Sequence, residues 1–199
     1  MQNQIVIEEL VQKVLDGMEL RLKIDSYDMN ENFETGVVTI RCNVHHARTG
    51  EHHVIEGSGV GMIDALFNGT VKLYADQFPS LKSIRFAHFG VKANFDSSRA
   101  NSRSDFSTEV TLAVANSHDR EYTFHANSPS ITRAFLAVVL EGVAFFINCE
   151  RAFIAVYNAL KHAKQSNRPD SIELYTGYLT TLVEATSYSE VIEQLKPAE

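Results

Sequence analysis

The fold is decided at a strand-to-helix transition with the sequence EGSGVGMIDALF, residues 56–67. Gly57, Gly59 and Gly61 stand directly before an apolar helical pattern that contains one acid, Asp64. A dinucleotide-binding turn needs G-x-G-x-x-G between a parallel strand and its helix, and a P-loop needs Gly-Lys-Ser/Thr. Neither motif is present, because the spacing is G-x-G-x-G and the preceding strand belongs to a hairpin. Two interpretations stay open: close packing of a helix on a sheet, or backbone that lines a small-molecule pocket.

The pattern on either side of this transition occurs twice along the chain. Alternating apolar residues predict strands, and apolar residues at helical spacing predict a helix after every third strand. The predicted strands lie at residues 20–29, 37–44, 51–59, 84–93, 105–114 and 120–127, and the helices at 61–78 and 128–148. This order predicts an α+β fold of two βββα units, over residues 20–78 and 81–148, that form helix-backed antiparallel sheets.

Helical patterns also stand at both ends of the chain. Residues 5–20 predict an N-terminal helix whose end is weakened by Gly17. Residues 150–199 read as helices interrupted at SNRPDS and are too few to bury much core of their own. We therefore expect one domain over residues 1–149 and a helical appendage over residues 150–199.

Composition narrows the class of protein. The 199 residues are 44% hydrophobic and carry a formal charge of −7, which argues against a nucleic-acid partner. No apolar run reaches the length of a membrane helix, and the N-terminus lacks the basic region of a signal peptide. Cys42 and Cys149 match no metal or redox spacing. We expect a cytoplasmic protein without membrane contact, metal or cofactor.

Four segments together resemble one known domain. GSGVGMIDALF, FAHFGVKA, SDFSTEVTLAV and YTFHANSPSITRAFLAVVLEGVAFFIN follow one another in the order of that domain's motifs. They resemble the C-terminal allosteric domain of 2-isopropylmalate synthases and the related citramalate synthases, over residues 20–148. Four motifs in register are fairly specific for this domain and much less specific for its ligand.

The resemblance implies a non-catalytic regulatory and dimerisation domain of branched-chain amino-acid biosynthesis. It implies a homodimer that binds leucine, isoleucine or a related metabolite near the subunit interface and acts on a partner enzyme. Carried over position by position, the implied ligand-binding residues are Gly59, Gly61, Ile63, Asp64, Phe89, Ala93, Asp105, Phe106, Ser128 and Ile131. Backbone N–H groups, an acid and an apolar slot are what an amino acid requires.

Several positions depart from the pattern of the family. Phe106 stands in place of a small alanine, Phe124 and Ala126 in place of glycines, and Phe89 in place of a tyrosine. The added bulk favours a pocket filled by the protein's own side chains. The alternatives are then a structural or partner-binding homodimer, or a small-molecule enzyme that uses the dimer cleft.

The enzymatic alternative has few candidate groups. The synthases carry out their chemistry in a separate metal-dependent barrel of about 250 residues, for which this chain has no room. Asp64 and Asp105 are each either a pocket acid or a structural carboxylate, and His125 is a candidate for the pocket wall. His45 and His52 are predicted to pair across a hairpin, as two metal ligands without a third or as a solvated tip.

Overall fold

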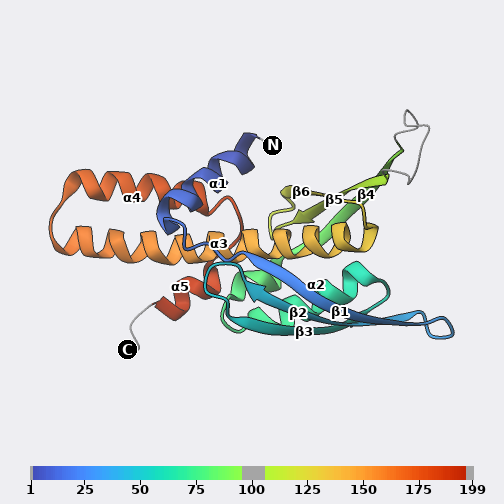
Figure 1. Cartoon of the computed structure of the whole chain (residues 1–199). Helices are drawn as coiled ribbons and strands as arrows, with labels where there is room; N and C mark the ends of the chain where they lie inside the picture. The colour runs from blue at the N-terminus through green and yellow to red at the C-terminus, as the bar shows by residue number, and fades with distance from the viewer. Residues whose placement is uncertain (1, 96–105, 196–199) are drawn as a thin grey trace.

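The computed structural model describes residues 2–95 and 106–195 and confirms the predicted α+β class. Within these residues, six strands form two three-stranded antiparallel sheets, in the orders β1-β2-β3 and β4-β5-β6 (Figure 1). The elements are α1 (Gln2–Leu15), β1 (Leu22–Asn32), β2 (Val37–His46), β3 (His52–Gly59), α2 (Met62–Tyr74), the 3₁₀ helix η1 (Pro79–Ser83), β4 (Arg85–Phe95), β5 (Phe106–Ala115), β6 (Glu121–Ser128), α3 (Ile131–Gln165), α4 (Pro169–Leu182) and α5 (Ser189–Leu195).

The two βββα units form a three-layer arrangement. Helix α2 packs on β2 and β3, and the first half of α3 packs on β5 and β6. The two helices contact each other and run side by side between the sheets (Figure 1). Each also reaches the first strand of the other unit, because α3 contacts β1 and the ring of Phe67 lies 4.3 Å from that of Phe86 in β4. The helix layer therefore buries apolar residues of both sheets at once.

The strand-to-helix transition permits this packing because two glycines let the backbones of β3 and α2 touch. A Cβ atom on Gly57 would lie 2.8 Å from the Cα atom of Gly69 in α2, and one on Gly69 would lie 2.9 Å from the carbonyl of Glu56. Neither position has room for a side chain. The packing interpretation of the glycine segment is therefore correct for Gly57.

Helix α3 is continuous for 35 residues. The hydroxyl of Ser130 accepts a hydrogen bond from the Arg133 amide and caps its first turn. The expected boundary between residues 149 and 150 falls inside this helix, whose second half continues away from the sheets and packs against α4 (Figure 1). Tyr188, which precedes α5, stacks on Phe153 of α3 at 4.3 Å between ring centroids. The C-terminal residues thus join the same core.

The start of β1 is attached to the middle of α3. The buried side-chain amide of Asn148 accepts a hydrogen bond from the Leu20 amide at 2.7 Å and donates one to the Leu20 carbonyl at 3.0 Å. Helix α1 also packs on α3. These contacts fix where β1 leaves the helix layer.

By length and composition α3 qualifies as a helix able to cross a membrane, and 61% of its most apolar stretch is buried in the fold. No uninterrupted apolar run of that length was found in the sequence, because Arg133, Glu141, Asn148 and Glu150 interrupt the apolar residues. Burial of this extent is what the core helix of a folded domain shows.

Candidate functional site

The start of α2 holds four of the residues that the resemblance singles out. A Cβ atom on Gly59 would lie 2.7 Å from the Ala65 amide nitrogen, so Gly59 serves close packing. The Asp64 carboxylate accepts a hydrogen bond from the Val60 amide at 3.1 Å, which favours its interpretation as a first-turn carboxylate. Ile63 is half-buried against the core. Gly61 differs from both other glycines of the segment, because a Cβ atom there would meet nothing within 4 Å.

Gly61 also leaves the N-terminus of α2 without a side-chain cap. It is the N-cap residue, its backbone is extended, and no side chain accepts a hydrogen bond at the cap position. The N-terminus of α3 differs, because Ser130 caps it and the Ser128 hydroxyl accepts a hydrogen bond from the Ser130 amide at 3.1 Å. Of these two helices, only α2 has first-turn amides without a side-chain cap. Such amides attract a carboxylate or phosphate.

A second group of predicted residues forms an exposed apolar patch on β4 and α3. Phe89 is 57% exposed and meets Phe135 edge to face, with ring centroids 6.0 Å apart. Ile131, the first residue of α3, lies one turn before Phe135 and is exposed as well. Val91 follows Phe89 on the same side of β4 and is 44% exposed. We call these four residues the β4–α3 patch.

The structure leaves part of the predicted pocket undescribed. Asp105 lies outside the described residues, so both interpretations of this acid stay open. For Ala93 and Phe106 only the backbone is described, and it places them in β4 and β5, where Ala93 pairs with Thr108. The hypothesis that Phe106 fills the pocket therefore stays a prediction.

Phe124 and His125 of β6 lie elsewhere than the expected pocket wall. Phe124 is buried and packs on α3, where its ring lies 5.5 Å from that of Phe145 and occupies the space beside Gly142. His125 points to the opposite, exposed face of the sheet, where its Nδ1 atom lies 3.0 Å from the Thr111 hydroxyl. Alternation along a strand makes this outcome necessary once Phe124 enters the core.

The predicted histidine pair is present, together with an acid that sequence reasoning missed. His45 and His52 stand opposite each other in β2 and β3, and both Nδ1 atoms approach Asp25, at 2.7 and 3.4 Å. Asp25 is the extra residue of a bulge in β1, between Ile24 and Ser26, and no sequence pattern marks a bulge. Within residues 2–95 and 106–195, no cluster of three such side chains is arranged to hold a metal ion.

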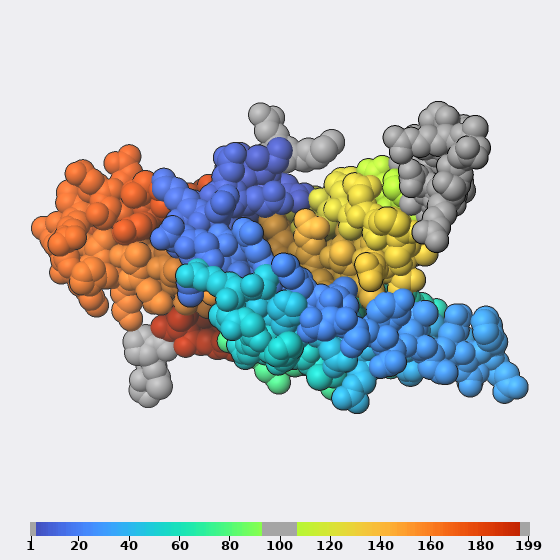
Figure 2. Space-filling view, viewed as in Figure 1, coloured from blue at the N-terminus to red at the C-terminus, as the bar shows by residue number. Residues whose placement is uncertain are grey.

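One cavity was not predicted from the sequence. It is a groove of about 1090 Å³ between α1, β1 and the first half of α3, and Figure 2 shows this face, with α3 exposed between α1 and β1. Its floor includes Leu136, Leu140 and Phe124, and its rim includes the contiguous residues 19–27. None of the predicted ligand-binding residues whose side chains the structure describes lines it. The only sequence signal was the apolar alternation of the first strand.

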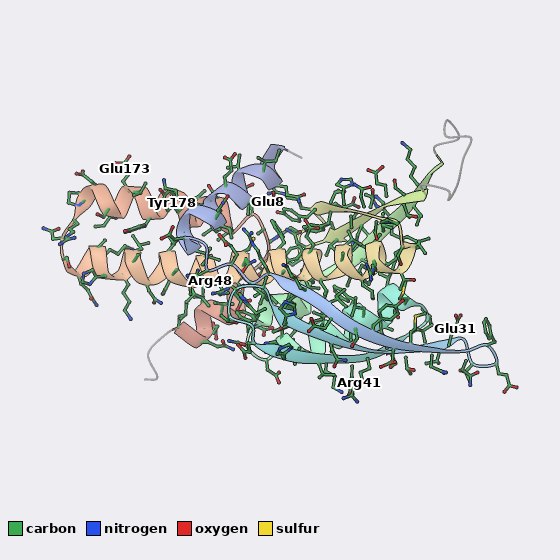
Figure 3. All side chains as sticks on the ribbon, viewed as in Figure 1. Glu8, Glu31, Arg41, Arg48, Glu173 and Tyr178 are labelled. Carbon is green, nitrogen blue, oxygen red and sulfur yellow. The ribbon has the colours of Figure 1, made fainter. Side chains whose placement is uncertain are left out.

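Acidic groups stand around this groove. Burial raises the pKa of Glu141 above its ordinary value, and the nearby charge of Glu8 raises it further. Figure 3 labels Glu8 on α1. Glu19 is buried, and its Oε1 atom has no hydrogen-bond partner. Arg133 and Lys23 also line the groove and offset part of this charge.

Comparison of the chain with protein-family models and with curated proteins found no match. The fold and the site therefore define only a structural class. The chain is an α+β protein of two βββα units, with no side-chain cap at the start of α2 and a groove of about 1090 Å³.

Proposed function

We propose that the chain is a non-catalytic, homodimeric regulatory module that binds a small amino acid or related metabolite where α2 begins. The observation that carries this proposal is the open, uncapped N-terminus of α2 at Gly61. First-turn amides bind a ligand carboxylate. The Oδ2 atom of Asp64 accepts the hydrogen bond from the Val60 amide, and its other carboxylate oxygen can accept one from a ligand ammonium group. The bound module would act on a partner enzyme.

The β4–α3 patch supplies the apolar surface that such a ligand requires. Helices α2 and α3 both begin at the same end of the molecule, and β4 runs toward that end (Figure 1). Phe89 and Ile131 are exposed there without an apolar neighbour that covers them fully. An aliphatic side chain placed against these residues removes apolar surface from water at about 25 cal/mol per Å².

Uncovered first strands support the homodimer. In both units the helix covers the second and third strands best, so apolar side chains on the helix side of the first strand stay exposed. Tyr27 and Met29 of β1 are 38% and 44% exposed, and Phe89 and Val91 of β4 are exposed as well. Sheet faces of this kind are normally buried against another element, which a second copy provides.

The enzymatic alternative has less support. Asp64 already holds the Val60 amide, and His125 lies on the outer face of its sheet. These two groups are therefore not directed at a common point, as an acid and a base that share a substrate must be. A purely structural homodimer stays the main competing function.

A ligand screen tests the proposal. The unmodified chain is heated with each of the common amino acids and their 2-oxo acids at millimolar concentration. We expect an apolar amino acid or 2-oxo acid to raise the unfolding temperature, since a ligand bound to the native state stabilises by RT ln(1 + [L]/Kd). Titration calorimetry then gives the affinity of each ligand that stabilises.

A matched pair of variants locates the site. Gly61→Ser gives α2 a side-chain cap that occupies the first-turn amides, so ligand affinity should fall while stability rises by a few tenths of a kcal/mol. Gly177→Ser makes the same replacement at an open position of α4 and should leave affinity unchanged. If no amino acid or 2-oxo acid stabilises the unmodified chain, the ligand-binding proposal is wrong, and the structural homodimer is the function that the result supports.

A further inference from the structure

Strand β1 is a long sheet edge that borders the groove. It is 11 residues long and, among the described residues, pairs with β2 alone. Residues 22–27 of β1 line the groove. The strand then continues past the start of α3, and Figure 3 labels Glu31 near its far end. A free edge of this length offers unpaired backbone amides and carbonyls to another chain.

The facing sheet edge across the groove is protected. Gln4 of α1 acts on the outer edge of β6 as a neighbouring strand would, since its amide group donates to the Thr123 carbonyl at 3.0 Å and accepts from the Thr123 amide at 2.9 Å. Of the two sheet edges that flank the groove, the β6 edge is therefore hydrogen-bonded by Gln4, and the β1 edge is open. This asymmetry points to β1 as the strand that pairs with another chain.

The exposed side chains of β1 match the groove. Across the β1–β2 ladder, Tyr27 stands opposite Cys42 and Met29 opposite Ile40, both of them buried. The apolar side chains of β1 therefore face the helix layer, on both sides of the bulge. These side chains are Leu22, Ile24, Tyr27 and Met29. A strand that continued the sheet with the same pattern would place its apolar side over Leu136 and Leu140, on the groove floor.

Strand β1 of a second copy has this pattern. When it runs antiparallel to the first β1, the side chains of the two strands are complementary. In an antiparallel pair, residues that face the helix layer must stand opposite residues that also face it. Because side chains alternate between the two faces of a sheet, the allowed registers differ from one another by two residues. In one of them Leu22 stands opposite Met29 of the second copy, and Ile24 opposite Tyr27. The same register brings Lys23 opposite Asp28 on the outer face, twice in each pair of chains.

The neighbouring registers are less favourable. A shift in one direction brings Asp25 opposite Asp28, which is a repulsive pair. A shift in the other direction pairs only residues 22–27 and leaves Met29 outside the ladder. The favoured register puts the two-fold axis between Asp25 and Ser26, so the bulge interrupts the ladder only at its centre.

We infer that two copies of the chain join through β1, as antiparallel neighbours in one six-stranded sheet, with each β1 filling part of the other copy's groove. This inference rests on the proposed homodimer and adds the interface and its register. A self-complementary strand gives the isologous contact of a two-fold dimer. Bonding of the two edges also removes the exposed strand edge.

Charge reversal tests the register. Lys23→Asp and Asp28→Lys each bring two like-charged pairs together, so each variant should self-associate at least about tenfold more weakly than the unmodified chain in low salt. A mixture of the two variants restores both opposite-charge pairs, and it should form a one-to-one heterodimer that is tighter than either homodimer. Native mass spectrometry of a size-tagged mixture reads out the species.

Controls keep a folding defect apart from an interface defect. Circular dichroism must show each variant folded, and Lys161→Asp, on the second half of α3, should dimerise like the unmodified chain. A chain with both Lys23→Cys and Asp28→Cys should form a disulfide-linked dimer on oxidation. The two positions lie about 17 Å apart within one strand, too far for a disulfide within one chain.

The outcomes separate this inference from the homodimer itself. If the unmodified chain dimerises and neither charge reversal weakens it, the β1 interface is wrong and the proposed homodimer stands. If both reversals weaken the dimer but their mixture forms no heterodimer, the register is wrong. A monomeric unmodified chain removes the homodimer and the interface together.

Discussion

At the scale of single residues, the three glycines of the opening segment have different roles. Gly57 and Gly59 lie where β3 and α2 are too close for any Cβ atom, and Gly61 lies in open space at the helix start. The sequence pattern G-x-G-x-G does not separate these roles, because spacing carries no information about the distance to α2. The closeness depends on Gly69, which stands outside the segment.

This difference predicts the stability of two alanine variants. Gly57→Ala should lower the free energy of unfolding by at least about 2 kcal/mol, because the new methyl group overlaps the backbone of α2. Gly90→Ala is the matched control, since Gly90 is also a strand glycine, its φ is not positive, and its Cβ atom would meet nothing within 4 Å. It should change stability by less than about 0.5 kcal/mol. Urea unfolding of both variants checks this, and equal stabilities would contradict the close packing.

A buried acid predicts a pH dependence. Glu150 of α3 is almost fully buried and accepts a hydrogen bond from the Ser80 amide at 3.0 Å. Burial raises the pKa of Glu150 above its ordinary value of 4.5, and Glu190 adds to the effect. The native state then holds the proton more tightly than the unfolded state. The contribution of Glu150 is thus most favourable below its unfolded pKa and is lost as pH rises through the raised folded pKa.

Glu150→Gln should remove this loss. The glutamine oxygen can still accept the hydrogen bond from Ser80 and carries no charge at any pH. At pH 7 the variant should be more stable than the unmodified chain, by about 1.4 kcal/mol for each unit of pKa shift, and the difference should shrink toward pH 4. Denaturant unfolding at a series of pH values measures it. A variant that is less stable than the unmodified chain at pH 7 would show that the buried charge is compensated.

At the scale of elements, periodicity predicted most of the structure. The six described strands and helix α2 lie within a few residues of their predicted positions, because alternating and helical patterns reflect which side of each element is buried. The helix at 128–148 was predicted too short. Its pattern continues through Cys149 and Phe153, and a change in composition near Asn148 was interpreted as a boundary. Asn148 is polar because it bonds the Leu20 backbone, and the helix continues past it.

The candidate site was less predictable than the elements. The sequence resemblance placed Gly61, Phe89 and Ile131 in one pocket. In the structure Phe89 and Ile131 are exposed and Gly61 is partly exposed, at the end where α2 and α3 begin (Figure 1). The sequence did not predict the groove, which depends on how α1 and β1 sit against α3. Nor did it predict that Phe124 would fill the space beside Gly142, because a pairing between two distant elements has no periodic signature.

At the scale of the whole molecule, two sheets enclose a layer of two helices. The second half of α3 extends beyond the sheets, with α1 and α4 on one side of it and α5 on the other (Figure 1). This arrangement covers the second and third strands of each unit and leaves apolar side chains of the first strand exposed. The groove and the open edge of β1 lie on one of the two uncovered sides. We propose that a second copy of the chain covers this side, because β1 is complementary to a second β1 that runs in the opposite direction.

The mass of the unmodified chain in solution tests the central claim most directly. Light scattering coupled to size-exclusion chromatography at micromolar concentration should give twice the chain mass of 22.3 kDa. The same mass should persist across a tenfold dilution within the micromolar range. A single species of 22.3 kDa under these conditions would contradict the homodimer and every statement about its interface.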